Sequence, residues 1–166
     1  MGKSMRIKVV DVSELPITLQ ATVPEEYLDD MGHMNVMWYI HLFSRAAGEF
    51  FRLFGLTDDY FTAHQAGTFA LEMHVRYLAE VRLGQRVVVR SRALGRSAKR
   101  FHFMHFMVHA DSGVLAATEE AVGTHVDLRT RRTSPMPPEV AAALDRLIAE
   151  HRRLPWEAPV CGVMKP

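Results

Sequence analysis

The most restrictive feature of the sequence is a long apolar segment, "YLDDMGHMNVMWYIHLFSRAAGEFFRLFG", which runs from Tyr27 to Gly55. Its few polar positions follow helical spacing, at i, i+4, i+7 and i+11, and therefore form one narrow stripe. A helix that is apolar over most of its circumference is expected to be buried on most sides. Gly55 is expected to cap the C-terminal end of this helix, since glycine is common there. The polar stripe consists of His41, Arg45, Gly48 and Arg52.

Strands are expected before the long helix and after it. Directly after the long helix, and before the later strands, a short second helix is expected with Thr57 as its N-cap. Apolar and polar side chains then alternate, which is typical of a half-buried strand, and a bulge or bend is expected near Gly123 in the last strand. Because the connections are short, consecutive strands are expected to be antiparallel neighbours. The expected strands are residues 17–23, 68–80, 86–94, 100–110 and 114–129.

These elements predict an α+β fold in which a five-stranded antiparallel sheet wraps around one long central helix. A C-terminal helix is expected over residues 139–152, where apolar side chains recur at helical spacing, followed by an irregular tail. The length of 166 residues predicts a single domain over residues 1–166 with a core of its own.

The composition restricts the partners that the chain is expected to have. The net charge is +1, which gives no electrostatic reason to expect nucleic acid or an anionic membrane as a partner. Cys161 is the only cysteine, so no disulfide can form within one chain, and a reducing cytoplasm is the expected location. The N-terminal residues contain no apolar stretch of the kind found in signal peptides, and no run of apolar residues is long enough to span a membrane.

The pattern D-x-x-G-H-x-N in "DDMGHMN", followed by Tyr39, resembles the hotdog-fold acyl-CoA thioesterases of the 4-hydroxybenzoyl-CoA thioesterase type. The resemblance covers about residues 15–132. The stretches "GHMNVMWY", "LEMHVRYLAE", "KRFHFMHFM" and "ATEEAVGTHVDLRTRR" are similar to a narrower subgroup that includes betainyl-CoA thioesterase. The resemblance implies an acyl-CoA substrate, no cofactor apart from the CoA of that substrate, and a homodimer or homotetramer with its sites at the subunit interface.

Thioester hydrolysis needs a base or nucleophile and a group that stabilises the developing oxyanion. The resemblance assigns the first role to Asp29, with Gly32 allowing a close approach of substrate, and the second to a backbone amide near Val36. His33 and Asn35 are expected to position the thioester or the attacking water. The simpler alternatives are a capping or solvated role for Asp29, an N-cap role for Asn35 and a packing role for His33.

Substrate-binding residues are expected in two groups. A quaternary ammonium group would require aromatic faces, which attract cations through their π-electrons. The CoA phosphates would require basic side chains, either at the turn near residue 97 or after the last strand. The alternatives are core packing for the aromatic residues and a solvated charge run for the basic ones. The candidates are Trp38, Tyr39, Phe43 and Phe69 for the cation, and Arg96, Lys99 and Arg100, or Arg129, Arg131 and Arg132, for the phosphates.

Other acidic and histidine side chains are weaker candidates. Glu49 is interpreted as a partner of Arg45 or Arg52, with catalysis as the alternative. Glu72 and His74 lie on a polar strand face that is expected to meet solvent, with the active site of a partner subunit as the alternative. Histidines at positions 102, 105 and 109 invite a metal hypothesis, but on a strand His102 and His105 point to opposite faces, so no catalytic metal is expected. The rival functions are a hydratase of the same fold, whose motif needs a different spacing of Asp and His, and a module that binds acyl-CoA without hydrolysing it.

Overall fold

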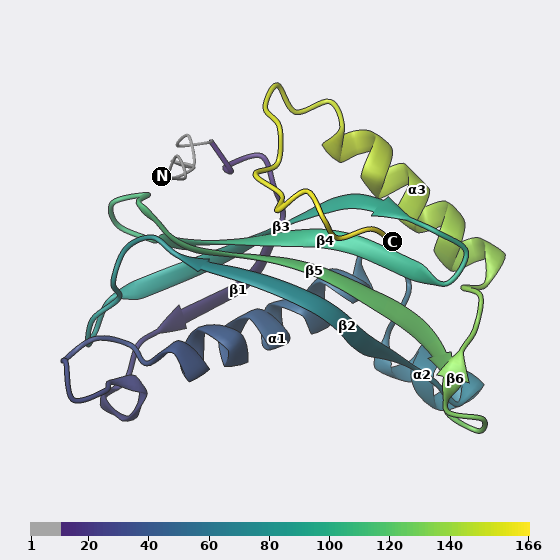
Figure 1. Ribbon diagram of the computed structural model, residues 1–166, viewed down its shortest axis with the longest axis horizontal. Coiled ribbons are helices and arrows are strands. Elements are labelled where there is room, and N and C mark those ends of the chain that lie inside the picture. The colour runs from purple at the N-terminus through teal and green to yellow at the C-terminus, as the bar shows by residue number, and fades with distance from the viewer. Residues whose placement is uncertain (1–10) are drawn as a thin grey trace.

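The computed structural model describes residues 11–166 and contains one curled antiparallel sheet (Figure 1). The strand order is β1-β3-β4-β5-β2, and the short β6 pairs with β5. Most of the N-terminal segment, for which no signal peptide is expected, lies outside the described residues. The strands are β1 (Ile17–Thr22), β2 (Ala66–Tyr77), β3 (Arg86–Arg96), β4 (Arg100–His109), β5 (Leu115–Asp127) and β6 (Arg132–Thr133).

The expectation that all consecutive strands are neighbours is wrong for β2 and β3. The turns after β3 and β4 do join neighbouring strands, but β2 pairs with β5 at the far edge of the sheet. The segment between residues 78 and 85 carries the chain from the β2 edge of the sheet to β3, which lies next to the opposite edge. The edges are therefore β1 and β2, and β2 is a 12-residue edge strand.

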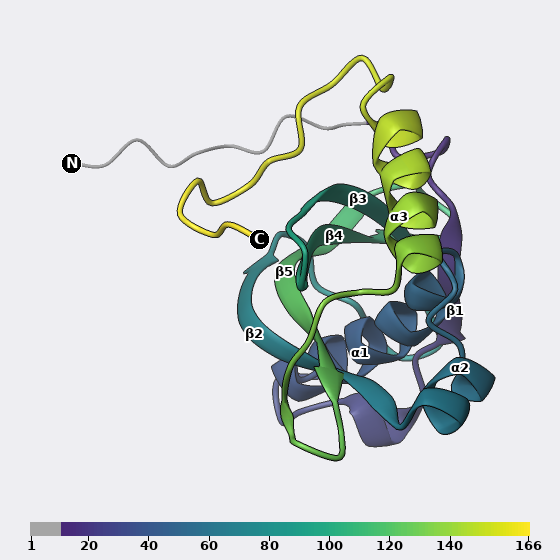
Figure 2. The same cartoon turned by 90° about the vertical axis from the view of Figure 1, so that its right-hand side faces the viewer.

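The helix α1 (Val36–Arg52) lies inside the curl of the sheet, as expected for a hotdog fold (Figures 1 and 2). Its buried side contributes Leu42, Phe43 and Ala46 to a core with β3 and β4 side chains. The expectation that it is buried on most sides is wrong, because the sheet covers one side and leaves the other open. Val36 and Met37 are among the exposed residues of this open side.

Two further helices follow the expected pattern. The helix α2 (Asp58–His64) begins at Thr57, whose hydroxyl accepts the Tyr60 N–H at 3.1 Å. The helix α3 (Pro138–His151) packs against β3. It lies beyond the end of β1, which pairs only with Arg86–Arg90, so it covers the remaining edge of β3. A 3-10 turn, η1 (Glu25–Tyr27), precedes the loop that leads into α1.

The tail after α3 crosses the outer face of the sheet, on the side opposite α1 (Figure 2). The Trp156 ring packs edge-on against Phe106 of β4, and the Arg92 guanidinium lies 4.2 Å from the Trp156 ring centre. The tail contains no helix or strand, as expected, yet it forms part of a buried cluster on this face. Within residues 11–166, none of the helices has the length and hydropathy that crossing a bilayer requires.

Candidate active site

Asp29 lies in a tight turn just before α1. Its backbone carbonyl accepts the Gly32 N–H at 3.0 Å, and its Oδ1 accepts the Met31 N–H at 2.9 Å. Gly32 has φ +79°, a left-handed conformation that favours glycine, and open space surrounds its Cα. The backbone conformation of the turn therefore explains the glycine at position 32. The expectation from the sequence instead explains Gly32 by a close approach of substrate. Asp29 Oδ2 lies 3.6 Å from His33 Nδ1, so the two candidate side chains are adjacent.

The first turn of α1 presents a free backbone amide. Asn35 is the N-cap, because its side-chain oxygen accepts the Met37 N–H at 3.0 Å. The structure thus shows the N-cap role of Asn35, and its role in positioning the thioester or water stays a prediction. Among residues 11–166, no acceptor for the Val36 N–H is found. This amide lies at the positive end of the helix dipole, as an oxyanion donor would.

A small pocket of about 270 Å³ opens beside this helix end. His33 and Val36 line it from the α1 side, and Tyr77 and Glu80 line it from the end of β2 and the segment that follows. Tyr39, the aromatic residue of the motif, also lines the pocket, is buried, and meets the Tyr77 ring edge-on with a centroid distance of 5.1 Å. The pocket therefore brings together three predicted site residues, His33, Val36 and Tyr39, next to the Asp29 turn.

A second pocket, of about 470 Å³, runs along the open side of α1 between that helix and strands β2 and β5. It begins at Ile40, about 6 Å along the helix from Val36 on the same face. Aromatic rings from four elements line it, and of these only Phe69 is a predicted binding residue. The aromatic lining residues are Phe51, Phe61, Phe69, Phe101 and Phe103.

Glu119 of β5 is the one acidic side chain in this second pocket. It is 3% exposed, and its Oε2 has no hydrogen-bond partner among the described residues. Burial raises the pKa of its carboxyl to about 7, because the apolar surroundings disfavour the charged form. A cation in the pocket would find an uncompensated carboxyl group next to aromatic faces.

A row of buried polar groups leads across the sheet to Glu119. Thr18 Oγ1 lies 2.7 Å from Ser91 Oγ, which lies 2.7 Å from His105 Nδ1. His105 is directly opposite Glu119 on the neighbouring strand, and its Nε2 has no partner among residues 11–166. Burial lowers the pKa of His105 to about 3, so the imidazole is neutral at ordinary pH.

The other predicted aromatic residues belong to the core rather than to the second pocket. Phe43 is fully buried and stacks on His105 with a centroid distance of 5.9 Å. Trp38 stacks on Tyr27 with a centroid distance of 3.9 Å. Phe69 is half exposed at the pocket, with the Arg131 guanidinium 5.6 Å from its ring centre.

The predicted phosphate-binding residues lie at the opposite end of the molecule from Asp29. Arg96 is already paired with Asp145 of α3, through bonds of 2.7 and 2.6 Å, whereas Lys99 and Arg100 are exposed at the turn between β3 and β4. In Figure 1 this turn and the start of α1 are at opposite ends of the long axis. A single chain therefore does not bring this basic cluster to the Asp29 turn.

The weaker candidates have ordinary roles. Glu49 is exposed and lies 3.6 Å from the Arg52 guanidinium, as expected. Among the basic residues after the last strand, which are the alternative phosphate-binding group, Arg129 pairs with Asp127. The hydrogen bonds from Arg129 lower the pKa of the Asp127 carboxyl to about 2. His102 and His105 point to opposite faces of β4, as the strand interpretation predicts.

The region from the end of β1 to α3, residues 23–144, matches the family model of the thioesterase-like superfamily. The chain belongs to this superfamily. It is 34% identical over 144 residues to betainyl-CoA thioesterase of Pseudomonas aeruginosa, covering 87% of this chain and 91% of that protein. It is also 30% identical to L-carnitine dehydrogenase/betainyl-CoA thioesterase of Ruegeria pomeroyi; that match covers 96% of this chain but 32% of the longer relative.

A solved structure supports the same fold. A Staphylococcus aureus protein in complex with CoA superposes with a TM-score of 0.78 at 25% identity, covering 86% of this chain and 90% of that one. The hotdog fold and the thioesterase class expected from the D-x-x-G-H-x-N motif are therefore confirmed. The roles of the individual site residues stay predictions.

Glu119 is absent from the site that the motif predicts, although the sequence contains a signal for it. Two adjacent glutamates, Glu119 and Glu120, occur in a stretch whose other residues, from 115 to 124, are apolar or small. Neighbouring strand residues point to opposite faces, so two such carboxyls can both avoid burial only if both faces are solvated. β5 is buried on both faces, and both glutamates are buried with it.

Proposed function

We propose that the protein hydrolyses betainyl-CoA, or a close relative with a small cationic acyl group, to the free acid and CoA in the cytoplasm. The observation that carries this substrate class is Glu119, an uncompensated buried carboxyl in a pocket lined by aromatic rings. Aromatic faces and a carboxylate together attract a quaternary ammonium group, and a neutral acyl group would leave Glu119 without a partner. The identity to betainyl-CoA thioesterase supports the same choice.

In the proposed reaction, the Val36 N–H stabilises the oxyanion that forms on the thioester carbonyl. Asp29 acts in one of two ways. It removes a proton from the attacking water, or its carboxylate attacks the carbonyl and water then hydrolyses the resulting anhydride. In either route the CoA thiolate leaves and is protonated. The Met31 N–H holds the Asp29 carboxyl in place through a hydrogen bond to Oδ1, and His33 Nδ1 lies 3.6 Å from the other carboxyl oxygen.

We further propose that the active unit is a homodimer, which can assemble further into a tetramer. The long edge strand β2 exposes Phe69, Leu71 and Met73, and an uncovered edge of this kind readily pairs with another strand. Antiparallel pairing of two β2 strands about a twofold axis places the Tyr77 end of one strand next to the Ala66 end of the other. The Asp29 turn of one protomer would then approach the second pocket and the basic residues of its partner.

The assignment of Asp29 is tested by thiol release from acyl-CoAs with betainyl, short aliphatic, long aliphatic and aromatic groups. Asp29→Asn is expected to lower kcat by about 10²–10⁴-fold, the usual contribution of a positioned base. Asp30→Asn, a change at the exposed neighbouring position, is expected to keep wild-type activity. Full activity of Asp29→Asn would refute the mechanism, and binding of every acyl-CoA without turnover would indicate a binding module.

A further inference from the structure

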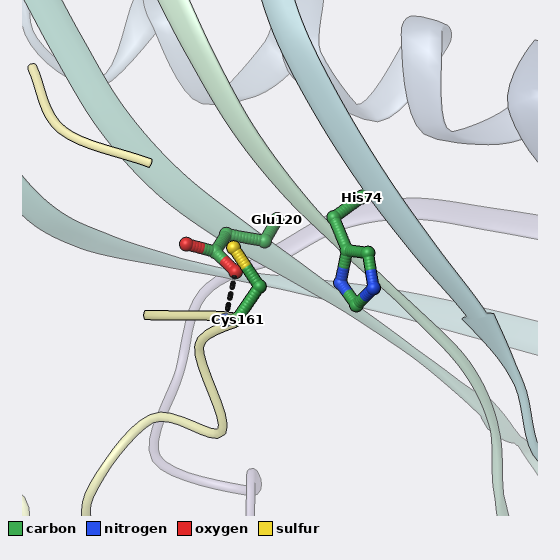
Figure 3. Close-up of side chains that lie close together, drawn as sticks. All are labelled: His74, Glu120 and Cys161. Atoms are coloured by element: carbon green, nitrogen blue, oxygen red, sulfur yellow. Dashed lines mark hydrogen bonds between the residues drawn. The ribbon is translucent and has the colours of Figure 1, made fainter. Parts of the chain in front are cut away.

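The outer face of the sheet carries a cluster of potential metal ligands, on the opposite side of the sheet from the proposed reaction. His74 of β2, Glu120 of β5 and Cys161 of the tail each offer one ligand atom, and these atoms lie within 4.8 Å of one another (Figure 3). His74 and Glu120 are direct neighbours across the two strands. Cys161 reaches them because the tail folds back over the sheet, so three separate segments of the chain meet at this point.

Glu120 is fixed in position before any ion binds. It is 1% exposed; its Oε1 accepts a hydrogen bond from His102 Nε2 at 2.8 Å, and its Oε2 accepts the Cys161 N–H at 2.6 Å. Within residues 11–166, the ion-pair partner of Glu120 is His102, which carries a charge only when it is protonated. A buried carboxylate is costly without a stable positive charge nearby.

The donor set matches the preferences of Zn²⁺. Thiolate sulfur, imidazole nitrogen and carboxylate oxygen are its usual protein ligands, and tetrahedral coordination at the usual bond lengths separates the donor atoms by about 3.3–3.8 Å. Small side-chain rotations would bring the three atoms to this spacing. The negative charges of a Cys161 thiolate and of Glu120 would balance the two positive charges of the ion. His102 would then be the residue that orients a ligating carboxylate, as is common around zinc.

We propose that His74, Glu120 and Cys161 bind a Zn²⁺ ion that fastens the C-terminal tail to the outer face of the sheet. Binding removes the proton from the Cys161 thiol, leaves the fourth position of the ion to water, and adds a strong link to a segment held by few bonds. The other links are the Cys161 N–H bond to Glu120, a bond from Arg92 to the Trp156 carbonyl at 2.9 Å and a bond from Arg76 to the Pro159 carbonyl at 3.4 Å.

The test uses the full chain without a purification tag, stripped of metal and titrated with Co²⁺ as a spectroscopic probe for the zinc site. One Co²⁺ per protomer is expected, with a thiolate-to-cobalt charge-transfer band that Zn²⁺ abolishes by displacement. Cys161→Ser is expected to lose this band, and His102→Ala to weaken binding by about 10–100-fold. His41→Gln, a change on the open side of α1, is the matched control and is expected to bind as the wild type does.

A second readout follows the tail itself. Trypsin can cleave after Arg153, at the start of the tail, and Zn²⁺ is expected to slow this cleavage at least 10-fold in the wild type but not in Cys161→Ser. Thioester hydrolysis by Cys161→Ser is expected to stay within about twofold of the wild type, so this proposal and the proposed function can fail separately. The absence of a charge-transfer band in the wild type, or an unchanged band in Cys161→Ser, would overturn the proposal.

Discussion

Glu119 and Glu120 are neighbours in the chain, yet their carboxyl groups face opposite sides of the sheet. Glu119 lines the pocket beside α1, and Glu120 meets the tail on the outer face. At the residue scale, the two-residue period of a strand separates one acidic pair into two different sites. Each carboxyl is buried, and each site is proposed to hold a cation, one carried by the substrate and one a metal ion.

His151 provides a residue-scale prediction about pH and stability. Its Nδ1 accepts the Ala93 N–H at 2.8 Å on the edge of β3 that β1 leaves uncovered. Burial, and to a lesser extent Arg92, lowers the pKa of His151 to about 4. Because the unfolded chain binds this proton near pH 6.5, the stabilisation is complete above that pH and is lost as the pH falls towards 4.

The measurement is urea denaturation of the wild type and of His151→Asn at pH 7 and pH 5. Asparagine keeps an acceptor for the Ala93 N–H but does not titrate. From pH 7 to pH 5, the wild type is expected to lose about 1–2 kcal/mol more unfolding free energy than the variant. Equal losses in the two proteins would contradict the assigned protonation of His151.

At the scale of elements, local signals locate most helices and strands correctly. Thr57 begins α2 as predicted, and α3 spans Pro138–His151, close to the expected residues 139–152. The strand order and the open side of α1 depend on contacts between distant segments, which periodicity does not encode. The expected irregularity near Gly123 is a register shift in the opposing strand, between Ala70 and Glu72, while Gly123 itself makes room for a neighbouring ring.

Gly123 therefore gives a prediction for β4 and β5. A Cβ at this position would lie 2.4 Å from Phe101 Cε2, too close for the ring to stay where it is. Gly123→Ala is expected to lower the unfolding free energy by about 1–3 kcal/mol, as overpacking of a core does. Chemical denaturation measures this loss, and the double variant Gly123→Ala/Phe101→Leu is expected to recover part of it. A neutral single substitution would show that Phe101 can move freely.

At the scale of the whole molecule, the proposed dimer brings the Asp29 turn of one protomer close to the second pocket of its partner. In one chain the Asp29 turn precedes α1, whereas the second pocket extends along α1 from Ile40 to Phe51, and the exposed basic residues lie near the far end of that helix. The sequence motif predicts the α1 end of the proposed site through its resemblance to thioesterases. The pocket end is assembled from β2, β4, β5 and both neighbouring helices, so no single stretch of sequence reveals it.

Co-expression of two variants tests whether the site is shared between protomers. If Asp29 of one chain acts with Glu119 of the other, a heterodimer of Asp29→Asn and Glu119→Gln chains contains one intact site. Either variant homodimer is expected to hydrolyse betainyl-CoA only weakly. The purified heterodimer is expected to recover to about half of the wild-type rate, because one of its two sites is intact. If both residues of a site come from one chain, the heterodimer shows no recovery.

The most direct test of the central claim compares betainyl-CoA with 3,3-dimethylbutyryl-CoA, its uncharged analogue of similar shape. The wild type is expected to favour the cationic substrate in kcat/KM by about 100-fold, and Glu119→Gln to lose most of that preference while hydrolysing the neutral analogue normally. Glu49→Gln, which alters an exposed glutamate of α1, serves as the control and is expected to keep the preference. A preference that persists unchanged in Glu119→Gln, or a wild type that does not favour betainyl-CoA, would contradict the account.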